Sequence, residues 1–315
     1  MRSEGPNRRT VLRGAVGALV ASGMSGCGFG AEAAPAELIV ATGPPGAVYR
    51  EIGTEIATLL DARLPDTSVR TVETRASHDN LRLLARGTAD LGLSSLDSVL
   101  AGEITDASPL RAIGRLYDSF VHLVVLDGSG IRRAADLAGR RVSVGAVNSG
   151  TEFTALQIIA ETGVEPELVR LDQAASAEAL WNREIEAMFS LTGLPTPAIA
   201  DLADRHGVRL IDLSGIAVTM VDAHPEAYFP ATIPATTYRG IPACPTMSVP
   251  NLLLCPSALP DDLARTITDT VYTGAARIAR TRPEAAQINV RTGISTGVVP
   301  LHPGAEQWYR ENKPA

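Results

Sequence analysis

Short apolar runs alternate with amphipathic stretches from residue 37 onward, and this alternation predicts an α/β protein. The first apolar run, residues 38–41, is typical of a buried strand, and a glycine- and proline-rich turn follows at 42–46. Apolar residues then recur at helical spacing over 48–63. Such a corner suits an anion, because the first N–H groups of the helix are unpaired and carry the positive end of its dipole. A tight turn without a ligand is the alternative.

The same pattern continues along the chain. Ser77 stands where a helix N-cap belongs, before a helix that ends at Gly87. A second polar corner, at 148–151, precedes a helix that runs to about residue 162, and the chain becomes proline-rich from 225 to 260, with one strand expected near 248–254. The other expected elements are strands at 69–73, 89–93, 110–117, 121–126, 168–171, 186–189 and 208–213, and helices at 261–281 and 303–312.

The N-terminus has the pattern of an export signal. A basic start with Arg8-Arg9 precedes an apolar, Gly- and Ala-rich stretch at 14–23 that is too short to span a bilayer. Adjacent arginines are typical of a twin-arginine signal. The run Met24-Ser25-Gly26-Cys27 resembles a lipoprotein processing box, whose cysteine becomes lipidated, and a plain secretory signal with an incidental cysteine is the alternative. We therefore expect residues 1–26 to be the signal, Cys27 the lipidation site and 27–36 a flexible tether.

Composition narrows the class of protein. Hydrophobic residues make up 45% and charged residues 20% of the 315 residues, which argues against disorder and against a polytopic membrane protein. The formal net charge is −7 although the N-terminus is basic, so the rest of the chain is acidic and nucleic acid is disfavoured as a partner. The single lysine is Lys313, which excludes a Walker A site, an S-x-x-K acylase and a Schiff-base lysine.

Catalytic and metal motifs are missing from the sequence. There is no H-E-x-x-H, G-x-S-x-G or G-x-G-x-x-G run and no Cys/His cluster at metal-binding spacing, so we expect no enzyme activity, no cofactor and no metal. Three cysteines are too few for an iron–sulfur cluster. Cys244 and Cys255 would face the oxidising side of the membrane, and their separation suits adjacent strands joined by a turn. A disulfide between them and two buried thiols remain open alternatives.

Short motifs occur in a fixed order along nearly all of the chain beyond the signal. They are Thr42-Gly43 with Val48-Tyr49, Ser77-x-x-Asn80-Leu81, Gly87-x-Ala89-Asp90-Leu91-Gly92-Leu93, Gly145-Ala146 with Ser149-Gly150-Thr151, Gly193-Leu194-Pro195, Ile233-Pro234-Ala235 with Tyr238, and Pro300-Leu301-His302-Pro303-Gly304-Ala305. In this order they resemble the TAXI family, the substrate-binding subunits of tripartite ATP-independent periplasmic (TRAP) transporters. Each motif is short, so their order carries the resemblance.

The resemblance implies a two-lobed type II periplasmic-binding-protein fold with a ligand cleft between the lobes. We expect lobe I at 37–124 and 232–315 and lobe II at 125–231. The implied ligand is a small carboxylate, an amino acid or a dicarboxylate such as glutamate or 2-oxoglutarate. By motif position, the candidate ligand residues are Thr42, Gly43, Tyr49, Ser77, Asn80, Ser149, Gly150 and Thr151, with Tyr117 as a wall, and the set also includes Ser95, Asp97, Asn148 and Gly193.

The sequence departs from the family pattern near these positions. Ala76 stands where a glycine is usual, and Ser95-Leu96 replaces a Gln-Ser pair before Asp97. No arginine matches a family motif among the corner residues, so we expect the ligand carboxylate to rest on neutral donors; Arg75, Arg111 and Arg115 are the nearest arginines in the sequence. The implied function is a lipid-anchored binding protein that serves a TRAP permease. A lipoprotein that presents its closed form to a membrane receptor or sensor kinase is the alternative.

Overall fold

The computed structural model describes residues 35–101 and 109–312, and the expected signal, Cys27 and most of the tether lie outside them. The strands are β1 (Glu37–Ala41), β2 (Ser68–Val72), β3 (Leu91–Ser95), β4 (Leu110–Leu126), β5 (Arg141–Ser143), β6 (Glu167–Val169), β7 (Ala187–Thr192), β8 (Val208–Leu210), β9 (Phe229–Ile233) and β10 (Cys244–Pro256). The α-helices are α1 (Val48–Arg63), α2 (Ser77–Ala85), α3 (Leu96–Leu100), α4 (Gly150–Thr162), α5 (Gln173–Trp181), α6 (Pro197–Arg205), α7 (Ser214–Ala223), α8 (Asp261–Thr273), α9 (Ala275–Thr281), α10 (Val290–Gly293) and α11 (Pro303–Asn312). Short 3-10 helices lie at Ala134–Leu137 (η1) and Pro283–Gln287 (η2).

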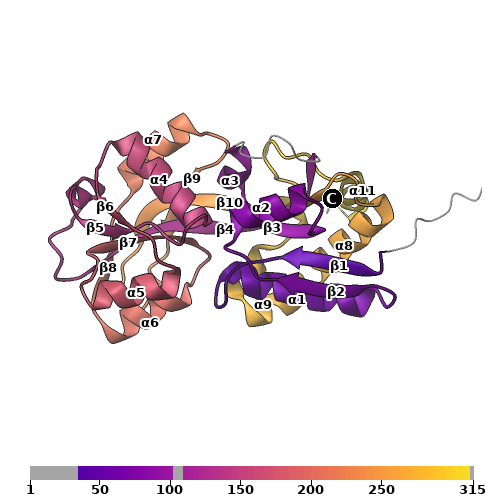
Figure 1. The fold of residues 1–315 in the computed structure, drawn as a ribbon, viewed down its shortest axis with the longest axis horizontal. Coiled ribbons are helices and arrows are strands. Elements are labelled where there is room, and N and C mark those ends of the chain that lie inside the picture. Colours follow the sequence, from indigo (N-terminus) through magenta and orange to yellow (C-terminus); the bar gives the residue numbers. More distant parts are fainter. Residues whose placement is uncertain (1–34, 102–108, 313–315) are drawn as a thin grey trace, which may run out of the picture. The chain divides into compact units, whose positions relative to one another are not determined.

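The strands form two parallel groups that are joined by an antiparallel pair. The strand order is β2-β1-β3-β10-β4-β7-β5-β6, with β8 added to β4 and β9 to β10. Strand β1 pairs in parallel with β2 and β3, and β5 pairs in parallel with β6 and β7. The pair β4 and β10 is antiparallel and runs from one group to the other (Figure 1). Each group with its helices is a lobe, and these two strands connect the lobes.

Residues 110–126 form one 17-residue strand, whereas the sequence pattern predicted two strands at 110–117 and 121–126. Asp118 and Ser119, which lie between the two predicted strands, pair with β10 within the observed strand. Strand β4 pairs with β10 as far as Phe120 and with β7 from Phe120 onward, so the chain passes between the lobes inside a strand. The residue boundaries expected for the two lobes remain a prediction.

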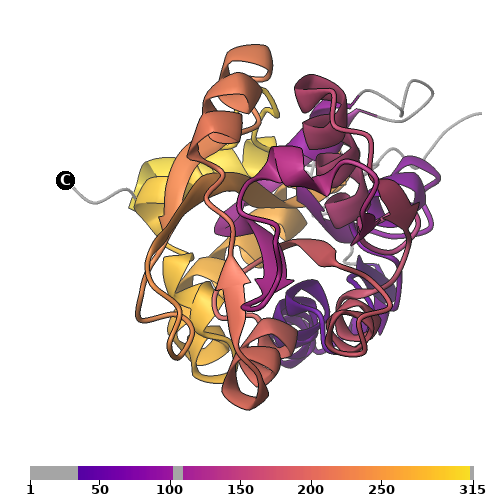
Figure 2. The same ribbon diagram turned by 90° about the vertical axis from the view of Figure 1, so that its left-hand side faces the viewer.

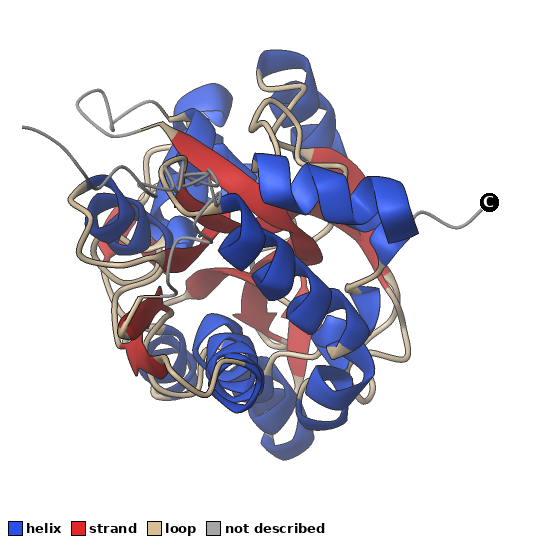
Figure 3. Cartoon of the chain, turned by 90° about the vertical axis from the view of Figure 1, so that its right-hand side faces the viewer, coloured by secondary structure: helices blue, strands red, loops and turns tan. Residues whose placement is uncertain are grey.

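Helices cover both faces of the sheet in each lobe. In Figure 1, α2, α3, α4 and α7 lie above the strands, and α1, α9, α5 and α6 lie below them. Figure 2 faces the second lobe, where the strands lie between helices. Figure 3 faces the first lobe, where α11, next to the C-terminus, packs against α8. Buried apolar residues fill the layers between helices and strands, for example Ile52 and Ile56 of α1 and Ile267 and Val271 of α8 in one shared cluster. No helix in the described ranges has the length and apolar character needed to cross a membrane.

Several element ends differ from the sequence pattern. The bounds of α1 and α11 agree with those predicted, but the helix expected over 261–281 divides into α8 and α9 at Gly274. Ser77 is the first residue of α2 and not its N-cap, which is Ala76. Helix α7 and the full length of β10 were not predicted, since prolines at 245 and 250 masked the strand pattern.

The structure decides between the two alternatives left open for Cys244 and Cys255, a disulfide and two buried thiols, in favour of the thiols. Both cysteines lie on β10, near its opposite ends, and both are buried free thiols. A strand rises about 3.3 Å per residue, so two positions on one extended strand cannot approach to the separation that a disulfide needs. The turn assumed between them is absent because the strand continues through Pro250, which pairs with Asp118.

Candidate functional site

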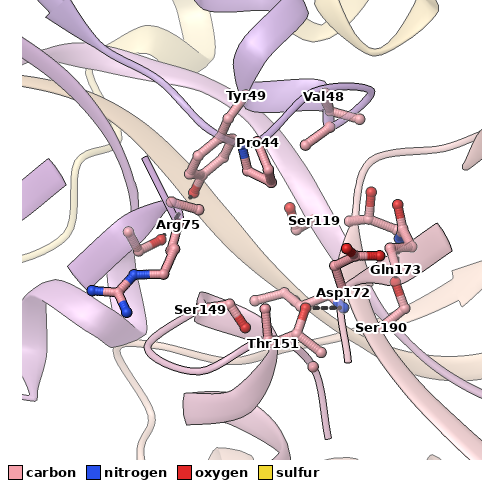
Figure 4. Close-up of a pocket in the computed structure, with 18 of the residues that line it drawn as sticks. Pro44, Val48, Tyr49, Arg75, Ser119, Ser149, Thr151, Asp172, Gln173 and Ser190 are labelled. Carbon is pink, nitrogen blue, oxygen red and sulfur yellow. Dashed lines mark hydrogen bonds between the residues drawn. The ribbon is translucent and has the colours of Figure 1, made fainter. Parts of the chain in front are cut away.

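A cavity of about 270 Å³ lies between the two lobes, and residues from both line it (Figure 4). The first lobe contributes the turn before α1, the turn before α2, and β4 residues. The second lobe contributes the segment before α4, the start of α5 and the end of β7. The lining residues are Pro44, Ala47, Val48, Tyr49, Arg75, Ala76, Ser77, Tyr117, Ser119, Gly145, Ala146, Ser149, Gly150, Thr151, Asp172, Gln173, Ser176, Phe189, Ser190, Leu191 and Thr192.

Four helices begin at this cavity. Helices α1 and α2 start there in the first lobe, and α4 and α5 in the second. The first-turn N–H groups of a helix have no partner within that helix, and the dipole places partial positive charge at the same end. Four such ends around one cavity create a positive field without a formal cation. The carboxylate of Asp172, which caps α5 by accepting the N–H of Ala175 at 2.8 Å, offsets part of that field.

Several hydroxyl groups at the cavity already accept an N–H and keep their own proton to donate. Ser149 Oγ accepts the N–H of Glu152 at 3.1 Å, and Thr151 Oγ1 accepts the N–H of Leu191 at 3.1 Å. Ser190 Oγ accepts from Gln173 Nε2 at 2.5 Å. Figure 4 shows these side chains gathered on one side of the cavity. The wall therefore offers hydrogen-bond donors, which an anion requires.

Tyr49 and Tyr117 form the apolar part of the wall in the first lobe. Their ring centroids are 6.4 Å apart and the rings are nearly perpendicular. Tyr49 Oη donates to Asn251 Oδ1 at 2.5 Å, which fixes the ring at the mouth of α1. Burial raises the pKa of both phenols well above the ordinary range, so both rings stay neutral at any physiological pH.

One arginine lines the cavity, and it has a partner. Arg75 Nε donates to Asp79 Oδ2 at 2.8 Å, and its guanidinium points away from the hydroxyl groups in Figure 4. Arg115 pairs with Asp118 at 2.6 Å and does not line the cavity, and neither does Arg111. The cavity thus carries one acidic and one paired basic side chain among neutral donors. No cluster of three or more potential metal ligands occurs within residues 35–101 and 109–312.

Six of the candidate ligand residues line the cavity: Tyr49, Ser77, Tyr117, Ser149, Gly150 and Thr151. The other seven do not. Thr42 is fully buried and donates to Val72 O at 2.9 Å, and Gly43 packs against the Tyr49 side chain. Asn148 adopts φ 62° and donates its N–H to Glu152. Ser95, Asp97 and Gly193 lie at contacts between the lobes, and Asn80 is held inside the first lobe.

Asn80 bonds to the backbone and not to the cavity. Its Nδ2 donates to Thr42 O and Leu93 O, both at 2.7 Å, and its Oδ1 accepts from Thr74 at 2.7 Å. Both amide protons are therefore used within the first lobe. The ligand contact expected for Asn80 from its motif position finds no free donor in this arrangement.

Sequence reasoning missed the residues that α5 and β7 bring to the cavity. Asp172 and Gln173 begin α5, and Ser190 and Thr192 lie near the end of β7. The run Leu171-Asp172-Gln173 after an apolar stretch has the pattern of a strand end followed by a capped helix. The same pattern precedes the helices that were recognised, and it could have indicated the start of α5.

A family model for the NMT1-like family matches residues 40–312. The chain belongs to the NMT1-like family. Several solved structures are similar to this NMT1-like protein over most of its length. The alkanesulfonate-binding protein SsuA from Xanthomonas axonopodis pv. citri, bound to MOPS, has a TM-score of 0.54 and 18% identity, with 90% of this chain and 86% of that chain covered.

The periplasmic aliphatic sulphonate binding protein SsuA from Escherichia coli has a TM-score of 0.51 and 18% identity, over 89% of this chain and 80% of that one. The structure of a putative L-cystine ABC transporter from Listeria monocytogenes has a TM-score of 0.52 and 14% identity, with 83% of this chain and 99% of that chain covered. These likenesses confirm the predicted fold: a mixed α/β sheet in the two-lobed periplasmic substrate-binding architecture. The TAXI subtype is a finer assignment than the family match gives.

Proposed function

We propose that this protein is an extracytoplasmic solute-binding protein that captures a small carboxylate, an amino acid or a dicarboxylate such as glutamate or 2-oxoglutarate. It holds the ligand between its lobes and performs no chemistry on it. The cavity of about 270 Å³ is of a size for such a small molecule. The six lining residues that the motif positions indicated are the core of the proposed site, and Ser119, Gln173 and Ser190 join them.

The observation that carries this proposal is the convergence of four helix N-termini and several donor hydroxyls on one cavity. N–H groups and hydroxyl protons stabilise an anion, and they offer nothing comparable to a cation. The paired state of Arg75 leaves the neutral donors to take the carboxylate. The SsuA proteins of similar fold are named for sulfonates, which are anions, and this supports an anionic ligand for the present chain.

A membrane permease is the proposed recipient of the ligand. The order of motifs supports a TRAP permease, whereas the similarity to the putative L-cystine ABC transporter structure from Listeria monocytogenes supports a partner of ABC type. Co-purification of the chain with each class of permease from its own genome distinguishes them. We further propose export through the N-terminal signal and anchoring through lipidated Cys27, which mass spectrometry of the membrane-bound chain tests directly.

Calorimetry with a panel of small molecules tests whether the ligand is a carboxylate. L-Glutamate or 2-oxoglutarate is expected to bind, and the corresponding dimethyl ester is expected not to bind, because it removes the charge while keeping the carbon skeleton. Thr151→Val should weaken binding about tenfold, since it removes one hydrogen bond to a charged group. Arg280→Ala, an exposed site on α9, is the control and should leave affinity unchanged. Equal binding of the acid and its ester, or silence across small carboxylates, would refute the proposal.

A further inference from the structure

Asp97 lies at a contact between the two lobes and not at the cavity. It belongs to α3 of the first lobe, and the residue is 2% exposed. Oδ1 accepts the N–H of Ser98 at 2.7 Å. Oδ2 accepts Thr154 Oγ1–H at 2.6 Å, and Tyr228 Oη lies 3.0 Å from the same oxygen. Tyr228 has one proton, for which Asp97 Oδ2 and Gln157 Oε1 compete. One buried carboxylate oxygen thus faces two hydroxyl groups.

Both hydroxyl donors come from the second lobe. Thr154 is on α4 and Tyr228 precedes β9, and they are 1% and 0% exposed. Hydrogen bonds to a charged group are the stronger ones, and they are strongest where water is excluded. Both contacts require that α3 of the first lobe stays against the second lobe. Separation of the lobes would break both and expose the carboxylate.

A chain of hydrogen-bonded side chains runs from beside this contact to the cavity wall. Ser98 Oγ lies 2.9 Å from Ser95 Oγ, and Ser95 Oγ lies 3.2 Å from Ser77 Oγ. Ser77 Oγ lies 3.4 Å from Tyr49 Oη, and both of these residues line the cavity. Tyr49 uses its one proton on Asn251, so its oxygen can only accept from Ser77.

The lobes also meet along this chain. A Cβ added at Gly150, the first residue of α4, would lie 3.2 Å from Ser77 Oγ and 3.5 Å from Ser95 Oγ. The start of α4 therefore touches the serine chain at the cavity, and Thr154, one turn later, reaches Asp97. The helix that supplies donors to the cavity is the same helix that Asp97 holds.

We propose that Asp97, with Thr154 and Tyr228, forms a latch that holds the two lobes closed over the cavity. Asp97 is a positioning residue: it keeps α4 against the first lobe, and it does not touch the ligand. Retention of a ligand by this latch rests on the proposed function, whereas closure of the lobes by it does not. The latch explains why a carboxylate at this position sits among serines and is buried.

Small-angle X-ray scattering of the ligand-free protein tests the latch without any ligand. The double variant Thr154→Val, Tyr228→Phe removes both hydroxyl groups and leaves Asp97 Oδ2 without either of these partners. The matched control, Thr268→Val with Tyr272→Phe, removes the same two groups within the first lobe, where they bond to Ala264 O and Arg115 O. We expect a larger radius of gyration for the latch variant than for the wild type and the control. Equal radii of gyration for wild type and latch variant overturn the proposal.

Tyr228→Phe alone serves as a milder variant if the double variant fails to fold, and thermal unfolding checks each protein first. With L-glutamate or 2-oxoglutarate as probe, the double variant should release the probe at least about tenfold faster, since the loss of the Thr154 bond to a charged group alone is worth about that factor. An unchanged release rate overturns the retention role. If neither probe binds the wild type, the proposed ligand class is wrong, and the scattering comparison still tests whether the latch holds the lobes closed.

Discussion

At the scale of single residues, the cavity contains a strained alanine. Ala76, the N-cap of α2, has φ 81° and ψ −141°, a conformation that favours glycine, and it lines the cavity. Its N–H donates to Thr74 Oγ1 at 3.0 Å, so the turn is held in place. In the family that the motifs resemble, a glycine is usual at this position, and the positive φ gives the physical reason.

We predict that Ala76→Gly stabilises the protein. Glycine adopts this φ without the steric penalty of a Cβ, and the gain should be about 1 kcal/mol, reduced by the greater entropy of glycine in the unfolded chain. Urea unfolding of the two proteins at pH 7 measures it. A lower unfolding midpoint for Ala76→Gly would show that the turn does not strain the alanine.

Asn80 leads to a second residue-scale prediction. Asn80→Ala should lower the free energy of unfolding by about 2–4 kcal/mol, because it strands the Thr42 and Leu93 carbonyls and the Thr74 hydroxyl in a buried site. Asn182→Ala, whose amide bonds only to exposed Glu184, should change it little. If Asn80→Ala keeps full stability but loses ligand affinity, Asn80 contacts the ligand after all.

At the scale of elements, sequence periodicity predicted features that depend on neighbouring residues, such as the bounds of α1. It missed features that depend on segments far away in the sequence, such as the continuity of β4. Helix α1 carries its apolar stripe and both of its ends within 16 consecutive residues. Strand β4 was predicted as two strands, because its continuity depends on pairing with β10 and then β7, segments more than 60 residues away from Phe120. In the candidate site the corners that start α1, α2 and α4 were found. The start of α5 was missed because this helix, although as long as α2, has almost no apolar periodicity.

The free cysteines of β10 give a prediction at this scale. Burial raises the pKa of Cys244 to about 11 and that of Cys255 to about 12, so both thiols stay protonated near neutral pH. In a chain with Cys27→Ser, neither should react with Ellman's reagent at pH 8 while folded, and two thiols should react in 6 M guanidinium. Recovery of fewer than two thiols after unfolding under non-reducing conditions would reveal a disulfide that this strand excludes.

At the scale of the whole molecule, the lobes meet a second time at Glu284 of η2. Its side chain is buried, and neither carboxylate oxygen accepts a hydrogen bond from another described residue. A Cβ at Gly193, after β7, would lie 2.5 Å from Glu284 Cγ. This contact and the latch lie between the same two lobes, and only three-dimensional packing reveals either, because the partners are distant in sequence.

Glu284→Gln should raise stability at neutral pH. Burial raises the pKa of Glu284, and Arg282 nearby offsets only part of this rise. The folded protein therefore holds this proton to higher pH than the unfolded chain, and stability falls as pH rises from the unfolded pKa through the folded one. Urea unfolding at pH 5 and pH 8 should show a gain of about 1–3 kcal/mol for the variant at pH 8 and a smaller gain at pH 5. A pH-independent difference would contradict the prediction.

The pairing of β3 with β10 has a consequence for the order in which the nascent chain folds. Strand β3 ends at Ser95, and its antiparallel partner begins at Cys244. The pairs that join β4, β5, β6 and β7 are complete once residue 192 has been made. The sheet of the second lobe can therefore assemble first, while β3 keeps an open edge, which is a template for unwanted pairing. Until the paired residues of β10 have been made, that edge of β3 has no partner in the sheet.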